Sequence, residues 1–469
     1  MYEQHRWPRL AWIPIVAGTV WLWTTAQIGL VPFLLLLPVG GLLLAAGIAH
    51  LLWPGDVHIT QTMALASAIG LLALIPGAFW LGLGASALLA ALAVACLLAA
   101  GSAAVYQEPF LSGVPRPEPG LGLAAKVAAD EIVLGLEQFS VGLPTGDEAR
   151  RLLGEIRAAR ELFGERGWMA DPTSYHMDPP ALEQPTSKSA HSGRIQYEHL
   201  SFESGYAPHP QEPGRQRWLG YGPTRTGHAY LLRHRDGDRP WMICNNGYRT
   251  GLPAIDLRTF WHYYETLGLN VLIPVLPLHG PRRIGRISGD GFFSGEVLDS
   301  VHAEAQAIWD IRRLIGWARS QGAPAIGATG LSLGGYTTAL LACLEPGLAC
   351  AVVGVPVSDL ARIFWRHGPK QQLGYFAHVE IDQALVQQVL KVVAPLAMEP
   401  LVPPIGRMIF GGISDRLVPP DHIRDLAVHW DDAKTVWYQG GHLTFMLDPR
   451  VQAGIDTTLR DVKLIAPRG

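Results

Sequence analysis

Charged residues are scarce in this chain, and they are almost absent from its amino-terminal part. Lys, Arg, Asp and Glu make up 16% of the 469 residues. None of these four residue types occurs between Arg9 and Asp56, or between Asp56 and Glu108. A soluble domain of this size needs polar faces on its helices. The two uncharged runs therefore argue against an ordinary soluble domain at the amino end.

Basic residues are not in excess, and cysteine is rare. The formal net charge is −3, which gives no support for nucleic-acid binding. The four cysteines are Cys96, Cys244, Cys343 and Cys350, and no two of them form a C-x-x-C pair. This pattern argues against a disulfide framework and against a zinc site. We expect no metal and no organic cofactor.

Each uncharged run is too long for one membrane-spanning helix, which needs about 20 apolar residues. Breaks at 27–32 and 76–82 predict four spans, near 11–28, 31–52, 61–80 and 83–105. Aromatic residues near the predicted span ends resemble the aromatic belts of membrane interfaces. They are Trp12, Trp21, Trp23, Trp53, Trp80 and Tyr106. No Asp, Glu, Lys or Arg lies inside a span, so we expect an anchor among membrane lipids rather than a transport path.

Basic residues also predict the orientation of these spans. Arg6 and Arg9 precede the first span, Arg116 and Lys126 follow the last, and the loop at 53–62 has no Lys or Arg. Four spans place both ends on one side, and the positive-inside rule makes that side the cytoplasm. We therefore expect a multi-pass integral membrane protein with a cytoplasmic catalytic domain.

Composition divides the chain into three regions. Residues 1–108 form the predicted membrane region, 109–193 a linker with amphipathic helices at 121–136 and 148–163, and 194–469 the remaining domain. Residues 169–192 are predicted to be a loop because they are rich in Pro, Ser and Asp. From 240 onward, short apolar strands alternate with helices, the first of them expected at 252–267, which predicts a mostly parallel sheet with helices on both faces.

One stretch in that domain carries a chemical signature, Gly330-Leu331-Ser332-Leu333-Gly334. An apolar run at 323–328 precedes it and a helical pattern at 336–344 follows it. A G-x-S-x-G sequence between a strand and a helix is typical of a turn that exposes a nucleophilic serine. The simpler alternative is an ordinary Gly/Ser-rich turn.

Two further residues follow predicted strands. Asp415 comes after 402–410 and His442 after 435–438, so both should lie at the same edge of the sheet as Ser332. A serine hydroxyl needs a base such as histidine to attack a carbonyl, and an acid to orient that base. Asp359 is the competing acid. We favour Asp415, because one helix and one strand separate it from His442.

These residues resemble the α/β-hydrolase superfamily, over roughly 195–465. The resemblance rests on the serine motif, on the chain order Ser332, Asp415, His442, and on the segment 411–419. It implies an α/β-hydrolase fold, with an oxyanion hole formed by the backbone N–H groups of Leu333 and Tyr248. At the second position this chain has Asn246-Gly247-Tyr248 where the family often has His-Gly.

Two other segments have readings that depend on the same resemblance. His279-Gly280 resembles the oxyanion motif but comes one strand too late, so we interpret it as pocket wall. Arg282 and Arg283 beside it either contact an anionic group or are solvated. The insertion at 359–402 contains aromatic residues and a helix, and it is either a lid over the strand ends or ordinary peripheral packing.

The sequence therefore predicts a membrane-anchored serine hydrolase that cleaves an ester, thioester or amide of a small acyl substrate, with a lipid-like substrate in view of the anchor. Two alternatives stay open. One is an acyltransferase on the same fold, and the other is a non-catalytic membrane scaffold with a hydrolase-like binding domain. The sequence leaves the substrate and the oligomeric state undetermined.

Overall fold

The computed structural model describes residues 7–137 and 142–466. The chain forms two compact units. The N-terminal unit comprises Met1–Ser140, Gly411–Asp421 and Trp437–Pro449, and the core unit comprises Val141–Phe410, His422–Val436 and Arg450–Gly469. The segments that carry Asp415 and His442 therefore belong to the N-terminal unit, whereas Ser332 belongs to the core unit.

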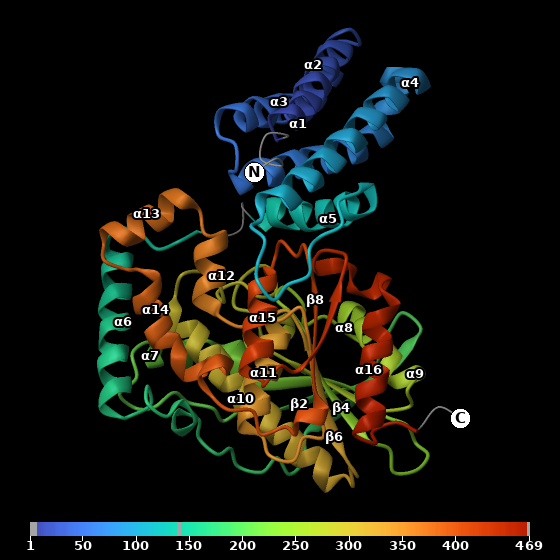
Figure 1. The fold of residues 1–469 in the computed structure, drawn as a ribbon. Coiled ribbons are helices and arrows are strands. Elements are labelled where there is room, and N and C mark those ends of the chain that lie inside the picture. The colour runs from blue at the N-terminus through green and yellow to red at the C-terminus, as the bar shows by residue number, and fades with distance from the viewer. Residues whose placement is uncertain (1–6, 138–141, 467–469) are drawn as a thin grey trace. The chain divides into compact units, whose positions relative to one another are not determined.

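Apolar helices make up most of the N-terminal unit, in blue and cyan in Figure 1. They are α1 (Trp7–Leu10), α2 (Trp12–Ala26), α3 (Leu30–Leu52), α4 (Val57–Gln107) and α5 (Leu121–Glu137). A non-helical residue, Gly82 (φ 73°, ψ 165°), divides α4 in two. Apolar helical segments thus occupy the positions of the four predicted spans, and their number of membrane crossings stays a prediction. By length and composition α3 and α4 are able to cross a membrane, which alone is weak support for a membrane region.

These helices pack closely through small residues. A Cβ atom at Gly18 would lie 2.5 Å from the backbone nitrogen of Leu44, which joins α2 to α3. Trp21 was expected among interfacial aromatic residues, but it is 0% exposed in the helical core. The reason is that Gly40 and Gly70 leave room for its indole ring. That expectation was therefore wrong for Trp21.

A nine-stranded sheet organises the rest of the chain, in the order β1-β2-β3-β5-β4-β6-β7-β8-β9. The strands are β1 (Thr186–Ser192), β2 (Ile195–Glu203), β3 (Thr226–Leu232), β4 (Trp241–Asn245), β5 (Asn270–Val275), β6 (Ile326–Leu331), β7 (Ala351–Gly354), β8 (Arg407–Gly412) and β9 (Lys434–Tyr438). The pairs from β1 to β5 through β3 are antiparallel, and those from β5 through β4 to β8 are parallel. The parallel, fully buried strands are the apolar runs that the sequence predicts.

Two expectations about local structure were wrong. The predicted loop at 169–192 contains β1, an edge strand whose residues are mostly exposed, so it has no apolar alternation to reveal it. The single helix expected after β4 is two short helices, α8 (Pro253–Thr259) and α9 (Trp261–Glu265). Phe260 lies between them with φ −105° and ψ 10°, outside the helical range.

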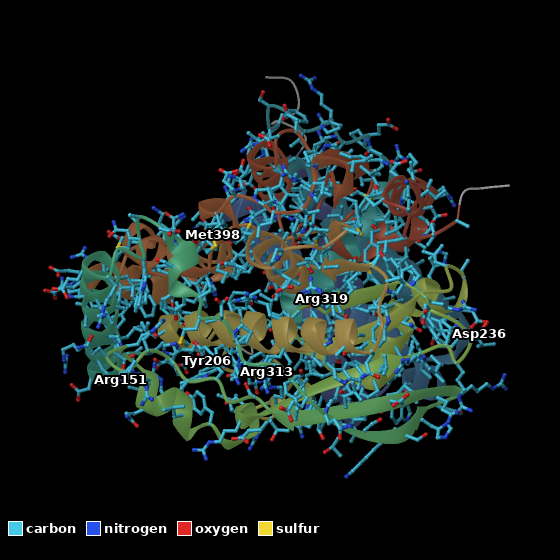
Figure 2. The ribbon with its side chains drawn as sticks, turned by 90° about the horizontal axis from the view of Figure 1, so that it is seen from below. Arg151, Tyr206, Asp236, Arg313, Arg319 and Met398 are labelled. Carbon is cyan, nitrogen blue, oxygen red and sulfur yellow. The ribbon has the colours of Figure 1, made fainter. Side chains whose placement is uncertain are left out.

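Helices cover both faces of the sheet, as predicted (Figure 1). On one face α9 and α16 (Pro449–Asp461) are joined by a 2.6 Å hydrogen bond between His262 and Gln452. On the other face lie α10 (Val297–Ser320), α11 (Leu333–Leu344) and α15 (Pro420–His429). Arginines near the end of α10 fix it to its neighbours (Figure 2). Arg313 donates to the carbonyl of Ser204 at 2.8 Å, and Arg319 pairs with Glu345 at 2.5 Å.

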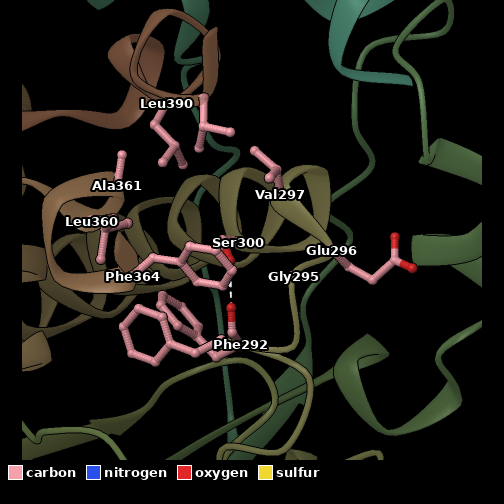
Figure 3. Close-up of a pocket in the computed structure, with 11 residues that line it drawn as sticks. Phe292, Gly295, Glu296, Val297, Ser300, Leu360, Ala361, Phe364 and Leu390 are labelled. Carbon is pink, nitrogen blue, oxygen red and sulfur yellow. Dashed lines mark hydrogen bonds between the residues drawn. The ribbon is translucent and has the colours of Figure 1, made fainter. Parts of the chain in front are cut away.

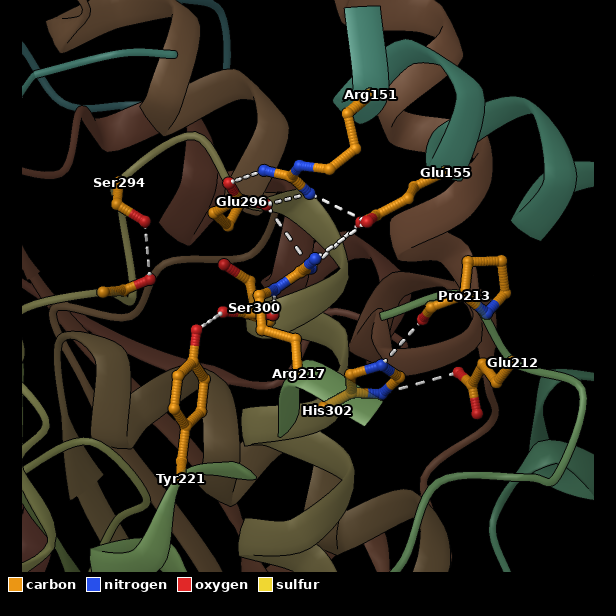
Figure 4. A network of polar contacts seen from close by, with 12 residues as sticks. Arg151, Glu155, Glu212, Pro213, Arg217, Tyr221, Ser294, Glu296, Ser300 and His302 are labelled. Atoms are coloured by element: carbon orange, nitrogen blue, oxygen red, sulfur yellow. Dashed lines mark hydrogen bonds and ion pairs between the residues drawn. The ribbon is translucent and has the colours of Figure 1, made fainter. Parts of the chain in front are cut away.

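An ion-pair network holds α6 (Gly146–Glu165) and α7 (Arg215–Gly220) to the start of α10 (Figure 4). Arg217 pairs with Glu155 at 2.8 Å and with Asp299 at 2.9 Å. Arg151 pairs with Glu155 at 2.8 Å and also with Glu296. The second predicted amphipathic helix thus packs within the core unit, whereas the first, α5, packs on α4 in the N-terminal unit.

The insertion after β7 is helical. It contains α12 (Leu360–His367), α13 (Lys370–His378) and α14 (Gln383–Leu390), followed by short 3-10 turns at Lys391–Val393 and Pro395–Ala397. Phe376 is buried, and its ring stacks on Phe364 with centroids 6.2 Å apart. Two of the aromatic residues in this segment, Phe364 and Phe376, therefore pack on each other within the insertion. Its role as a lid stays a prediction.

Gly101→Ala should destabilise the N-terminal unit, because a Cβ atom at Gly101 would clash with the backbone carbonyl of Ala124 in α5. Overpacking of this kind costs about 1–3 kcal/mol. Gly84→Ala in the same helix is the matched control, since nothing lies within 4 Å of its added Cβ atom. Thermal unfolding in detergent measures both. A melting temperature of Gly101→Ala equal to that of Gly84→Ala would contradict the packing argument.

Candidate active site

Ser332 lies on the turn between β6 and α11 in a backbone conformation that few residues adopt. Its φ is 58° and its ψ is −116°. The Ser332 N–H donates to Gly354 at 2.9 Å, and its carbonyl accepts from the N–H groups of Tyr336 at 3.1 Å and Val357 at 3.3 Å. Such a conformation costs about 1–3 kcal/mol and persists only where the surroundings impose it. The turn is thus the strained strand-to-helix elbow that the motif predicts.

Steric crowding explains why glycine occupies the positions two residues before and two residues after Ser332. A Cβ atom at Gly330 would clash with the carbonyl of Gly334, and one at Gly334 would clash with the carbonyl of Asn245 at the end of β4. The elbow therefore approaches the backbone of the neighbouring strand so closely that only glycine fits. This finding argues against the alternative of an ordinary Gly/Ser-rich turn.

The loop after β4 passes directly beside the serine. A Cβ atom at Gly247 would lie 3.3 Å from the Cβ atom of Ser332 and 3.9 Å from its Oγ atom. Asn245 anchors the start of this loop by donating from Nδ2 to the Thr338 hydroxyl at 2.9 Å. Leu333 begins α11, and the first N–H groups of a helix have no acceptor within the helix. The segments that carry Tyr248 and Leu333 thus lie where the oxyanion hole is predicted. The donor roles of the two N–H groups stay predictions.

The N-terminal unit contains a buried acid–histidine pair. The Nδ1 atom of His442 lies 2.7 Å from Oδ2 of Asp415, and the other Asp415 oxygen accepts the N–H of Val418 at 2.8 Å. Asp415 is 0% exposed and His442 6% exposed. With Nδ1–H directed at the carboxylate, the remaining ring nitrogen Nε2 is free to act as a base. The structure therefore brings Asp415 and His442 together, as predicted.

Two carboxylates shift the pKa of His442. Burial opposes a charge on the imidazole, but attraction and the hydrogen bond from Asp415, together with attraction from Asp130, raise its pKa above the usual 6.5. Burial and repulsion from Asp415 in turn raise the pKa of Asp130 to about 7. The pair thus favours the imidazolium that forms when a histidine accepts a proton.

Asp359, the alternative acid, has other partners. One of its oxygens accepts the N–H of Arg362 at 2.9 Å and caps α12, and the other accepts from Gln387 at 2.7 Å. Asp and Asn side chains are common in this capping role. The competing reading of Asp359 as the acid of the pair thus loses its support.

Arg282 is not solvated, because it is buried inside the core unit, and the anionic group that it contacts is the carboxylate of Asp310. It donates to the carbonyl of Val275 at 2.9 Å and pairs with Asp310 at 2.8 Å. His279 is also buried, with Nδ1 2.9 Å from the carbonyl of Pro277 and its ring edge-on to Tyr248. Desolvation lowers the pKa of His279 to about 4, so its imidazole is neutral near pH 7.

The cysteines are buried free thiols. Burial raises the pKa of Cys343 and of Cys350 to about 12, so neither is a ready nucleophile. In residues 7–137 and 142–466, no cluster of three or more His, Cys, Asp and Glu side chains is arranged to hold a metal ion.

A small apolar pocket lies in the core unit between the insertion and the segment before α10 (Figure 3). Its walls include Phe292, Leu360, Phe364 and Leu390, whose side chains converge, while the carboxylate of Glu296 points away. Phe293, which also lines it, packs on Tyr248 with ring centroids 5.1 Å apart. The side chain of Phe293 therefore links this pocket to the loop beside Ser332.

Sequence reasoning missed the residues that surround the acid–histidine pair. They are Asp130 and Glu131 of α5, and Arg416, which follows the acid. Asp130 accepts the N–H of His442 at 2.7 Å, and Glu131 pairs with Arg416 at 2.7 Å. A signal was present in the sequence, because two adjacent carboxylates interrupt the apolar face of the predicted helix at 121–136. Their partners lie 285 to 312 positions away in the sequence, which no local pattern reveals.

Backbone strain at the elbow predicts an order of stability between two variants. Ser332→Gly and Ser332→Ala both remove the hydroxyl, but only glycine adopts the Ser332 backbone angles without strain. We expect Ser332→Gly to be the more stable variant by about 1 kcal/mol. Thermal unfolding in detergent measures the difference, and a higher melting temperature for Ser332→Ala would mean that the turn is not strained.

Comparisons with known proteins give two close relatives. Uncharacterized proteins MT2702 and Rv2627c of Mycobacterium tuberculosis, from strains CDC 1551 and H37Rv, are each 40% identical over 363 residues, or 76% of this chain and 86% of theirs. No family model matches the sequence.

Solved structures with a similar fold include two acetyl xylan esterases. That of Paenibacillus sp. R4 is 13% identical with a TM-score of 0.44 and covers 63% of this chain and 99% of its own. That of Thermoanaerobacterium sp. JW/SL YS485 is 14% identical with a TM-score of 0.45 and covers 64% and 93%. Similarity at this level says nothing about the substrate. The sheet topology and the elbow give this chain an α/β-hydrolase fold, and its sequence places it in the same family as the two mycobacterial proteins.

Proposed function

We propose that this protein is a membrane-anchored serine hydrolase in which Ser332, His442 and Asp415 act as nucleophile, base and acid. The observation that carries the proposal is the strained, glycine-flanked elbow that presents Ser332. The buried Asp415–His442 hydrogen bond supports it, because each residue follows a strand, as Ser332 does. A serine hydroxyl alone is too weak a nucleophile, and this pair supplies the base that it needs.

The reaction proceeds through an acyl-enzyme. The Ser332 oxygen forms a bond to the substrate carbonyl carbon, its proton passes to Nε2 of His442, and the carbonyl oxygen becomes an oxyanion. Backbone N–H groups of Leu333 and Tyr248 donate to that oxyanion. The bond to the leaving group then breaks, and the leaving group takes the proton from His442. Water repeats the sequence on the acyl-enzyme, which releases the acid and restores Ser332.

Substrate preference follows from the apolar pocket and from the anchor. Aromatic and aliphatic side chains line the pocket beside the Tyr248 loop, and such an apolar lining suits the hydrocarbon part of an acyl group. The apolar N-terminal helices would keep the protein in a membrane, where esters with such chains are concentrated. An ester with an acyl chain, lipid-like in character, is therefore the substrate class that we propose, with the catalytic domain in the cytoplasm.

A fluorophosphonate probe tests the nucleophile. Membranes washed with alkaline carbonate should retain the protein, and the detergent-solubilised protein should react covalently with the probe. Ser332→Ala should abolish labelling, because the attacking oxygen is lost. Labelling that survives this substitution would identify a different serine. Absence of labelling in folded wild-type protein, with small and large probes alike, would favour the scaffold alternative.

The identity of the acid predicts unequal effects of two substitutions. Asp415→Asn should lower the rate of probe labelling by a factor on the order of 10⁴, because the amide no longer holds the required imidazole tautomer. Asp359→Asn is the matched control and should label at nearly the wild-type rate. The wild-type rate should rise with pH through a pKa above 6.5, since His442 must be neutral to accept the proton. A large loss in Asp359→Asn would reverse the assignment.

A further inference from the structure

One carboxylate of α5 binds the backbone of both segments that carry the acid–histidine pair. Oδ2 of Asp130 accepts the N–H of His442 at 2.7 Å and the N–H of Arg416 at 3.1 Å, and Oδ1 accepts the N–H of Leu443 at 3.4 Å. Asp130 is 0% exposed, so these amides take the place of water around it. Hydrogen bonds from backbone amides to a buried carboxylate are stronger than those between neutral groups.

The residue before His442 is shaped for this contact. A Cβ atom at Gly441 would clash with Oδ2 of Asp130, so only glycine allows the carboxylate to approach. A second side chain of α5, Lys126, donates to the carbonyl of Gln439 at 2.9 Å in the same segment. The histidine segment is therefore held by α5 at two positions.

The acid segment has its own contacts with α5 and α4. Arg416 is 1% exposed and pairs with Glu131 at 2.7 Å and with Glu108. Its guanidinium also donates to Gln107 at 3.1 Å, and Glu131 accepts from the Thr60 hydroxyl at 2.6 Å. The end of α4, the start of α4 and the middle of α5 thus meet at the residue that follows Asp415.

Helix α5 is itself fixed to α4 by close backbone contacts. A Cβ atom at Gly101 would clash with Ala124, and one at Gly135 would lie 2.9 Å from the carbonyl of Gln61. These contacts leave α5 little freedom to slide or rotate. A rigid α5 offers Asp130 at a fixed place, which is what a group that orients a catalytic loop requires.

We infer that Asp130 is a positioning residue for His442, and that through it the apolar N-terminal helices hold the base in place for catalysis. This inference rests on the proposed function. Asp130 acts in two ways, because it fixes the backbone of His442 and, when it is ionised, places a second negative charge beside the imidazole. The ionisable groups that face Asp130 are Asp415, His442, Arg416 and Tyr438.

Two substitutions of Asp130 distinguish these two effects. Asp130→Ala removes the acceptor of the buried N–H groups of His442 and Arg416 and of the partly buried N–H of Leu443, so the histidine segment should loosen. Asp130→Asn keeps the shape and one acceptor oxygen but removes the charge, so the segment should stay ordered. Loss of the charge makes the imidazolium less favourable and should lower the pKa of His442. The acid limb of the pH–rate profile should then move to lower pH.

Hydrogen–deuterium exchange of the full-length protein in detergent measures the first effect. In Asp130→Ala, amides in 411–421 and 437–449 should exchange at least about tenfold faster than in wild type, because hydrogen bonds to a charged group are lost. In Asp130→Asn they should exchange nearly as in wild type. Unchanged exchange in Asp130→Ala would overturn the inference, whatever the enzyme assays show.

The rate of probe labelling as a function of pH measures the second effect. Asp130→Ala should slow labelling by a factor on the order of 10², as expected for a displaced catalytic group. Asp130→Asn should restore most of that rate, with its acid limb at lower pH than in wild type. A different outcome would overturn the positioning role and leave a structural one. In that outcome hydrogen exchange is faster in Asp130→Ala, but neither variant changes the labelling rate or the acid limb of its pH profile.

Glu212→Gln is the matched control for a buried carboxylate. Glu212 lies in the core unit beside His302 (Figure 4). It accepts from the Tyr175 hydroxyl at 2.7 Å and from the N–H of His209 at 3.1 Å, and burial raises its pKa to about 7. Glu212→Gln should not change the acid limb of the pH–rate profile. It should also leave unchanged the hydrogen–deuterium exchange of the amides in 411–421 and 437–449. If wild-type protein is not labelled at all, the proposed function fails, and the exchange result alone then decides whether Asp130 holds the histidine segment.

Discussion

Close backbone contact at the turn between β6 and α11 is the constraint on which the candidate site depends. Gly330 and Gly334 leave no room for a Cβ atom, and the carbonyl of Asn245 bears directly on the turn. The end of β4 and the elbow must therefore be built together, which places the Gly247 loop beside the Ser332 side chain. Strain at Ser332 persists because three backbone hydrogen bonds hold the residue at φ 58°.

A balance of buried charges governs the acid–histidine pair in the N-terminal unit. His442 lies close to two carboxylates, Asp415 and Asp130, and Arg416 is close enough to Asp130 to be affected by its charge. Burial disfavours every one of these charges taken singly, so each needs partners. Asp130 finds them in backbone amides, and Arg416 in Glu131 and Glu108. The same contacts that make these charges tolerable also fix the positions of the segments that carry them.

Most of the core could be predicted because its signals are local. Apolar runs at the parallel strands, a glycine pair around Ser332 and Gly-rich turns before Asp415 and His442 all lie within a few residues of the feature that they predict. The predicted bounds of the buried strands lie within a few residues of the observed ones. Strand β1 was not predicted, because an exposed edge strand carries no apolar pattern. The buried position of Arg282 was not predicted for a related reason, because its partner Asp310 lies on a different element of secondary structure.

The sequence by itself determined the α/β alternation, the elbow at Ser332, the order of the three candidate residues and the apolar character of the amino end. Each follows from residue type and spacing along the chain. Only the tertiary structure decided which acid bonds His442, that Asp359 caps a helix instead, and that Asp130 supports the histidine segment. These outcomes depend on which backbone amides and carboxylates, distant in the sequence, meet in a buried space. The spacing of residues along the chain does not reveal such contacts.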